Sequence, residues 1–170
     1  MIPNKLEQAS VYLKGEELLG VADVDLPDFE YESEALNPLG VAGEIEPTSP
    51  AGLKALTLKL KFRIATPQAV ELLAPESKEI EVLGAVSLIE PLSKNTTITQ
   101  ARVFAIVQPK KEGMGKIEAK KTMDSEIELS VFYYMYEMGG SKIIEYDPVN
   151  WILFINGKDY LRDVRFAIGK

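Results

Sequence analysis

In the segment LTLKLKFRIA, residues Leu56 to Ile64 alternate strictly between apolar and polar side chains. A period of two residues is the pleat of a half-buried β-strand, so we expect the apolar row to face the core as far as Ile64. The opposite row carries three basic side chains, Lys59, Lys61 and Arg63. This row needs either acidic partners or water around it.

The same alternation, or a short apolar run between turn residues, recurs along the chain and predicts further strands. Val11 and Leu13 lead into a Lys-Gly turn, and the expected hairpin ends at Pro27, which cannot donate to a strand ladder. The other expected strands are 78–91, 96–109, 124–138, 141–147 and 149–155. The last of these runs into an Asn-Gly pair, a strong hairpin signal.

Two short segments have the features of helices instead. In TPQAVELLAP, Thr66 is a candidate N-cap, Pro67 takes the first helical position and Pro75 stops the helix. Apolar residues at helical spacing in 161–168 predict a helical turn or two at the C-terminal end. We therefore expect a single, mainly β domain over residues 1–170: a β-sandwich or barrel of about eight strands, one short helix packed on it and a short C-terminal helical turn.

Two longer segments lack any periodicity. Residues 28–53 hold three prolines and three glycines among acidic and apolar residues, which predicts an ordered loop that packs on something. Residues 109–123 hold five lysines and two glycines. We interpret this Lys/Gly-rich loop as a long mobile loop or β-arm, with a solvated hairpin tip as the plainer alternative.

The strand 124–138 contains a run of aromatic residues. Strict alternation places Tyr133 on the face of Ile127, and Phe132, Tyr134 and Tyr136 on the opposite face. Both faces would then be partly apolar, which favours a strand buried on both sides by a neighbouring subunit. The alternative is a monomeric β-sandwich binding module that recognises sugar or peptide through this Tyr-rich strand.

Composition excludes most familiar catalytic chemistry. The chain has no Cys and no His, so thiolate nucleophiles, imidazole bases and His- or Cys-ligated metals are absent. Carboxylate chemistry remains open in principle. However, the acidic cluster 23–34 lacks the spacing of an EF-hand, and no carboxylate pair stands in a recognisable glycosidase context. We expect no enzyme activity, no cofactor and no metal site.

Charge and targeting features restrict the function further. The formal net charge is −7, which argues against a protein that holds DNA by counterion release and suits a surface from which nucleic acid slides away. The longest wholly apolar run is VFYYMY, far shorter than a membrane span. No apolar stretch follows the first lysine, so we expect neither a signal peptide nor a membrane anchor.

Several segments, in order and spacing, resemble one protein family. These are IPNKL with VYLKGEELLGVADVDLPDFE, then LGVAGEIE, the alternating strand with the short helix after it, GMGKIEAKKTMDSEIELSVFYY, and NWILFINGKDYLRDVRFAIG. Together they resemble the major tail tube protein of contractile-tailed phages and of phage-tail-like (R-type) bacteriocins. The resemblance covers essentially the whole chain.

The resemblance implies a structural subunit without an active site. Such subunits form hexameric rings that stack into a hollow tube inside a contractile sheath, and contraction drives the tube through a target envelope; in a phage the tube then conducts DNA. Implied partners are further copies of the chain, the tail sheath protein, and the baseplate and tail-terminator proteins, with DNA passing only transiently. Implied locations are a virion tail or bacteriocin particle, assembled in the bacterial host cytoplasm and released without a signal peptide.

The resemblance also gives roles to particular residues. Segment 28–53 corresponds to the family's long loop that reaches the neighbouring ring. Candidates for ring stacking are Leu36, Leu39, Gly40, Val41 and Ile45. The spacing of basic and acidic rows, independently of the resemblance, gives these candidates for charge pairing between strands or between subunits: Lys59, Lys61, Arg63, Glu126 and Glu128. Candidates for an acidic lumen wall include Glu79 and Glu81, and the charge of the wall would keep DNA from adhering.

Overall fold

The computed structural model describes residues 1–18, 20–37, 40 and 42–170, and the prediction of a mainly β fold is confirmed. None of the helices in these ranges is long and apolar enough to cross a membrane. The elements are β1 (Ile2–Leu13), β2 (Glu16–Glu17), β3 (Val21–Asp25), β4 (Tyr31–Ser33), β5 (Thr48–Leu53), β6 (Thr57–Phe62), α1 (Pro67–Glu71), β7 (Lys78–Ile89), β8 (Thr96–Gly113), β9 (Ser125–Met138), β10 (Ser141–Asp147), β11 (Ile152–Ile155), β12 (Lys158–Asp159) and α2 (Arg162–Ala167).

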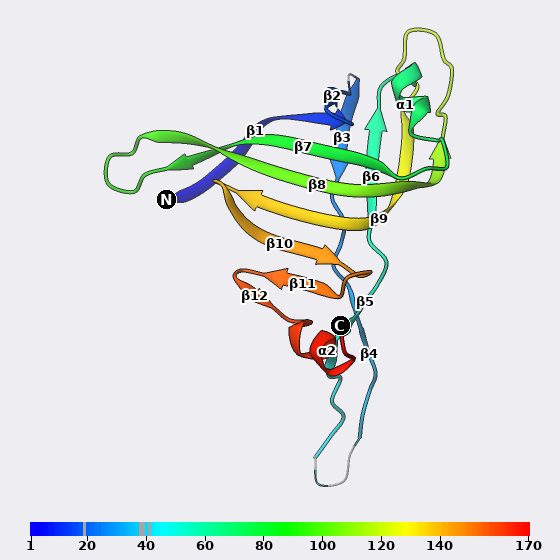
Figure 1. Ribbon diagram of the computed structural model, residues 1–170. Coiled ribbons are helices and arrows are strands. Elements are labelled where there is room, and N and C mark those ends of the chain that lie inside the picture. Colours follow the sequence, from blue (N-terminus) through cyan, green and yellow to red (C-terminus); the bar gives the residue numbers. More distant parts are fainter. Residues whose placement is uncertain (19, 38–39, 41) are drawn as a thin grey trace.

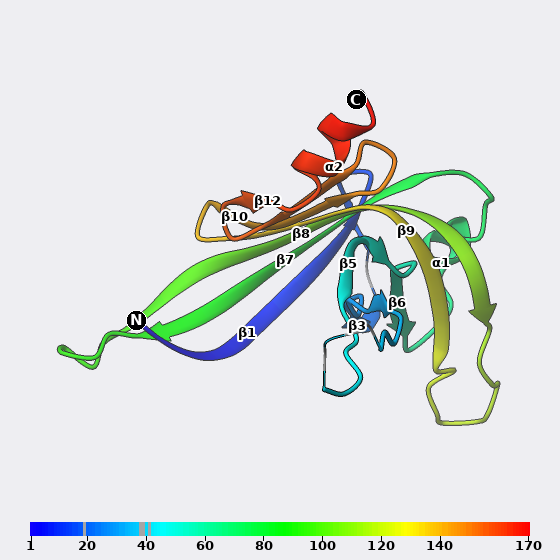
Figure 2. The same cartoon turned by 90° about the horizontal axis from the view of Figure 1, so that it is seen from below.

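The main sheet is antiparallel and has the strand order β12-β11-β10-β9-β8-β7-β1-β2. Strand β9 is long enough to pair with two strands along one edge: its first half pairs with β6 and its second half with β10. Strand β3 then pairs with the other edge of β6. Figures 1 and 2 show the sheet curving so that β3 and β6 lie across one of its faces, while β4 and β5 form a separate arm that leaves the body.

The core lies on the face of the sheet that β3 and β6 cover. Leu58, Leu60 and Phe62 of β6 are at most 1% exposed, as their alternation predicts. The prediction is wrong for Ile64, which is 58% exposed. The reason is that the regular strand pairing ends before Ile64: Phe62 pairs with Ser125, the first residue of β9, and beyond it this edge keeps a hydrogen bond from Met123 to Arg63.

A β-bulge in β9 changes the face on which its aromatic residues lie. Ile106 of β8 pairs with Tyr133 while the next residue pairs with Val131, so Phe132 is the extra residue. The bulge moves Tyr134 to the same side as Val131, where it is buried in the core, and Tyr136 packs against that core. The expectation of Tyr134 and Tyr136 on the face opposite to Ile127 and Val131 was therefore wrong.

Burial of Tyr134 predicts a loss of stability at alkaline pH. Its ring packs edge-on against Phe29 (centroids 5.5 Å apart), and desolvation raises the pKa of Tyr134 to about 12. The unfolded chain loses this proton near pH 10, so the unfolding free energy contributed by Tyr134 is complete below pH 10 and falls by about 2–3 kcal/mol as pH rises towards 12. In urea titrations between pH 9 and 12, the free energy of unfolding of Tyr134→Phe should decline less steeply with pH than that of the wild type. Tyr160→Phe, at an exposed position, should decline as steeply as the wild type. Equal slopes for all three would contradict this assignment.

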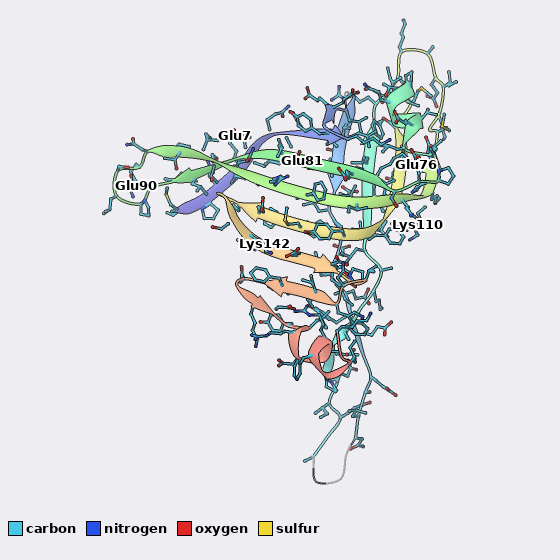
Figure 3. The ribbon with its side chains drawn as sticks, in the orientation of Figure 1. Glu7, Glu76, Glu81, Glu90, Lys110 and Lys142 are labelled. Atoms are coloured by element: carbon cyan, nitrogen blue, oxygen red, sulfur yellow. The ribbon has the colours of Figure 1, made fainter. Side chains whose placement is uncertain are left out.

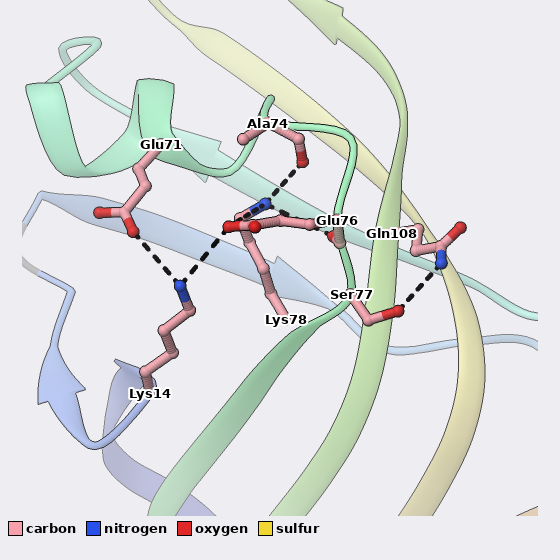
Figure 4. Close-up of polar contacts among 7 residues, drawn as sticks. All are labelled: Lys14, Glu71, Ala74, Glu76, Ser77, Lys78 and Gln108. Carbon is pink, nitrogen blue, oxygen red and sulfur yellow. Dashed lines mark hydrogen bonds and ion pairs between the residues drawn. The ribbon is translucent and has the colours of Figure 1, made fainter.

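The predicted helix is confirmed and is fixed to the edge of the sheet. The Thr66 hydroxyl accepts a hydrogen bond from the backbone N–H of Ala69 (3.2 Å), as expected of an N-cap. Lys78 is buried, and its Nζ donates to the carbonyl oxygen of Ala74 (2.6 Å), just after the helix (Figure 4). Lys14 reaches Glu71 from the β1–β2 turn (3.6 Å). These contacts orient α1 over the open end of the core.

Candidate assembly surfaces

The basic row of β6 lies between two acidic strands. On one side Lys59 is opposite Glu128 and Lys61 is opposite Glu126, both on β9. On the other side, β3 places Asp25 opposite Lys59 and Asp23 opposite Lys61. The β9 carboxylates are the candidates that the charge pattern gave for this row. The β3 aspartates were not among the candidates, although the alternation in DVD is the signal that could have found them.

Distances show which of these charges meet within one subunit. Lys59 Nζ lies 3.2 Å from a Glu128 carboxylate oxygen and 3.9 Å from a Glu126 oxygen. The Lys59 ammonium lowers the pKa of Glu128. Lys61 Nζ lies 2.9 Å from Asp25, whose carboxylate raises the pKa of Lys61. Arg63 follows the end of β6 and is exposed, and it makes no ion pair with any residue in the described ranges.

We expect charge reversal to affect these two basic positions differently. Lys61→Glu would place a carboxylate among Asp23, Asp25 and Glu126, so the urea midpoint should fall at low salt and partly recover at about 0.5 M NaCl, where surface charges are screened. Arg63→Glu is the matched control, since Arg63 forms no ion pair in the described part of the chain, and the urea midpoint of this variant should stay near that of the wild type. Equal effects of the two reversals would refute this assignment of partners.

The proposed lumen residues lie on the face of the sheet away from the core. Glu79 and Glu81 alternate along β7 with the buried Ile80. Glu79 is exposed, but Glu81 (Figure 3) forms an ion pair with Arg102 of β8, and Arg102 also lies 3.2 Å from Glu137 of β9. Arg102 therefore partly neutralises the charge of Glu81, whereas Glu79 forms no ion pair with the described residues and presents its carboxylate on the outer face of the sheet.

The segment 28–53 is more regular than its sequence predicted. Strands β4 and β5 pair with each other, and beyond them Leu36 and Ile45 exchange backbone hydrogen bonds of 2.7 and 2.9 Å. Proline and glycine conceal this pairing in the sequence because they break the alternation. The result is a narrow two-stranded arm that projects from the body (Figure 1), with Tyr31 and Leu53 at its base packed against the core.

The stacking candidates occupy the outer part of this arm. Leu36 and Ile45 are each 45% exposed and lie opposite each other. Gly40 is exposed and has φ of +91°, a conformation that favours glycine. The candidates Leu39 and Val41 lie outside the described residues. The structure thus brings three of the five candidates to the far end of one arm.

The Lys/Gly-rich loop, expected over 109–123, is shorter than that range. Strand β8 continues to Gly113, and β9 begins at Ser125. Between them, the backbone N–H of Lys116 donates to the Met123 carbonyl oxygen (2.8 Å), which closes the base of the loop.

The described residues contain no group of three or more acidic side chains arranged to hold a metal ion.

Comparison with known proteins yields one family and a set of structural relatives. A family model described as phage tail tube protein FII matches residues 3–169. A chain in the cryo-EM structure of an extracellular contractile injection system, the PVC sheath/tube terminator in the extended state, has 14% sequence identity and a TM-score of 0.57, with 81% of this chain and 98% of that chain covered. A chain of the PVC sheath-tube complex in the extended state has 13% identity and a TM-score of 0.53, with 76% of this chain and 88% of that chain covered. No curated protein matches. The two structural likenesses show a shared fold.

Proposed function

The chain belongs to the phage tail tube protein FII family, and from this premise we propose that it forms hexameric rings that stack into the hollow inner tube of a contractile injection apparatus. It is a structural subunit of a tail tube. The family match over residues 3–169 is the observation that carries this conclusion, because it assigns one function to nearly the whole chain. The alternative of a sugar- or peptide-binding module is not supported.

Free strand edges support a ring. In the described part of the chain, residues 2–9 of β1 pair on one side only, with β7, and β12 ends the sheet on the far side. Unpaired edges are sites of aggregation unless another strand or subunit covers them, and joining subunits edge to edge would remove them. The arm of residues 28–53 would then contact the neighbouring ring through its exposed apolar residues, Leu36 and Ile45.

Partners and location follow from the same proposal. The tube would assemble inside a sheath, on a baseplate and below a terminator protein, in a virion tail or a bacteriocin-like particle. Assembly would take place in the bacterial host cytoplasm. A lumen wall that carries Glu79 would repel DNA during its transient passage through a phage tail. A scaffold of this kind needs no catalytic residue, and we expect no enzyme activity.

Electron microscopy of the purified protein tests the proposal. At high protein concentration, negative-stain images should show six-fold rings and tubes of uniform width, and light scattering should report large assemblies that grow with concentration. A monodisperse monomer across the whole concentration range, with no ring in the images, would overturn the proposed function.

A further inference from the structure

An open groove of about 850 Å³ lies between β3 and the sheet, next to the core. Its apolar lining includes Leu6, Val24, Leu26, Val86 and Tyr136. Leu6 is 57% exposed and Leu26 is 47% exposed. Apolar side chains that line one groove are more typical of an interaction site than apolar side chains scattered singly over a surface. The volume lies within the range of about 300–1,000 Å³ that is typical of ligand pockets.

The groove carries acidic side chains around its apolar lining. Glu7, Glu17 and Asp23 all line it, and all three are exposed. Glu7 has a partner of its own, Lys5, at 3.1 Å (Glu7 is labelled in Figure 3). Glu17 forms no ion pair with the residues that the structure describes, and Asp23 lies opposite Lys61 of β6 without an ion pair among them. An occupant that matches this groove is therefore apolar at its centre and basic around it.

The loop between β8 and β9 has these properties. Its tip presents Ile117, which is 90% exposed, among Lys116, Lys120 and Lys121. Only Lys121 has an acidic partner in the described ranges, the neighbouring Glu118. The tip is thus an exposed apolar residue surrounded by positive charge, whereas the groove is an apolar surface surrounded by negative charge.

The base of this loop is rigid enough to present the tip. Gly115 has φ of +76°, and a Cβ atom there would lie 1.8 Å from the carbonyl oxygen of Met123, so only glycine fits. The Met123 N–H in turn donates to the carbonyl oxygen of Arg63 (2.8 Å), which ties the loop to the end of β6. A pre-ordered loop loses less conformational entropy on docking than a flexible one.

The loop of one subunit does not occupy the groove of that subunit. Ile117 is 90% exposed, and the base of the loop is hydrogen-bonded to Arg63 at the end of β6. Figure 2 shows β3 and β6 between β1 and the loop that joins β8 to β9. A contact between the loop of one copy and the groove of another would run head to tail, the type of contact that generates rings or filaments.

We propose that the groove receives the Ile117 tip of the β8–β9 loop from a second copy of the chain. The inference rests on the proposed function, because it assigns two of the surfaces through which subunits of the tube meet. Ile117 fills the apolar lining, and the lysines of the tip pair with Glu17 and Asp23. The contact is directional, since each copy offers its loop on one side and its groove on the other.

Disulfide trapping between singly substituted copies tests the contact, because the natural chain has no cysteine. Ile117→Cys and Leu26→Cys are prepared separately, mixed under assembly conditions and oxidised. A non-reducing gel should show a dimer in the mixture well above either variant alone. Leu92→Cys mixed with Leu26→Cys is the matched control, since Leu92 is an equally exposed leucine (94%) at the tip of the β7–β8 hairpin.

A charge exchange gives a second, independent measurement. Lys116→Glu with Lys120→Glu in the loop copy should lower the yield of the trapped dimer several-fold. Glu17→Lys with Asp23→Lys in the groove copy should then restore most of that yield. A yield that does not respond to either pair of reversals would contradict the role of the acidic residues.

The outcomes separate this inference from the proposed function. Tubes in the wild type together with a dimer yield no higher than that of the Leu92→Cys control would overturn the loop-in-groove contact and leave the tube function intact. A specific Ile117–Leu26 dimer supports the contact even in small oligomers. Absence of rings and tubes in the wild type counts only against the proposed function.

Discussion

Deletion of residues 37–46 is expected to abolish tube formation while leaving the subunit folded. The deletion removes the outer arm, including Ile45, and leaves Glu34, Ala35, Leu36 and Pro47 as a four-residue connection between the paired Ser33 and Thr48. None of the described residues removed belongs to the core cluster. Negative-stain images should therefore show single rings in place of tubes, with circular dichroism and the urea midpoint close to those of the wild type.

A variant that keeps the full length of the arm tests whether its apolar contacts, and not its length alone, stack the rings. Leu36→Ser with Ile45→Ser keeps the arm and the backbone pairing of these two residues, but removes its described apolar contacts. If apolar contacts stack the rings, this variant should form fewer and shorter tubes than the wild type at the same protein concentration. Tubes of normal length and number in the deletion variant would show that the arm does not stack the rings.

Leu60→Ala is expected to give the largest loss of stability of any variant discussed. Leu60 is 0% exposed at the centre of β6 and lies opposite Ile127 of β9. Truncation of a fully buried leucine costs about 2–5 kcal/mol, which is a large share of the 5–15 kcal/mol that is typical of folded domains. Urea unfolding followed by circular dichroism should show a markedly lower midpoint with little change in slope.

Ile64→Ala is the control from the same alternating row. Its side chain is 58% exposed because β6 ends at Phe62, so the unfolding free energy should change by no more than about 0.5 kcal/mol. The sequence pattern alone predicts similar losses for both variants. A loss at Ile64 comparable to that at Leu60 would mean that the strand extends further than Phe62.

Alternation predicted the β6 strand well because its apolar face is buried by one layer and its polar face has charged neighbours. The pattern could not reveal where the strand ends, since that depends on Ser125, where β9 begins far along the chain. The pattern also could not reveal the bulge at Phe132. A bulge shifts the alternation by one residue, and that shift is decided by the pairing of β8 with β9 and not by the side chains.

The candidate surfaces could be predicted only in part. Basic and acidic rows were visible in the sequence, but the partner of Lys61 is Asp25, because β3 leaves the first hairpin and pairs with β6. Glu81, a candidate for the acidic lumen wall, forms an ion pair with Arg102, because the pairing of β7 with β8 places the two side chains close together. Pairing between distant strands decides both, and local periodicity carries no information on it.

The pairing of early strands with late ones has a consequence for how the protein folds. Ile2 pairs with Ile89, and Lys59 pairs with Glu128, so β1 can pair with β7, and β6 with β9, only after long stretches of chain have been made. By contrast, β7 to β11 are successive antiparallel neighbours. Proteins dominated by non-local pairing fold in milliseconds to seconds, whereas local hairpins form within microseconds. On a ribosome, residues 2–9 of β1 would remain unpaired until β7 has emerged, so the nascent chain is most vulnerable to aggregation before that point.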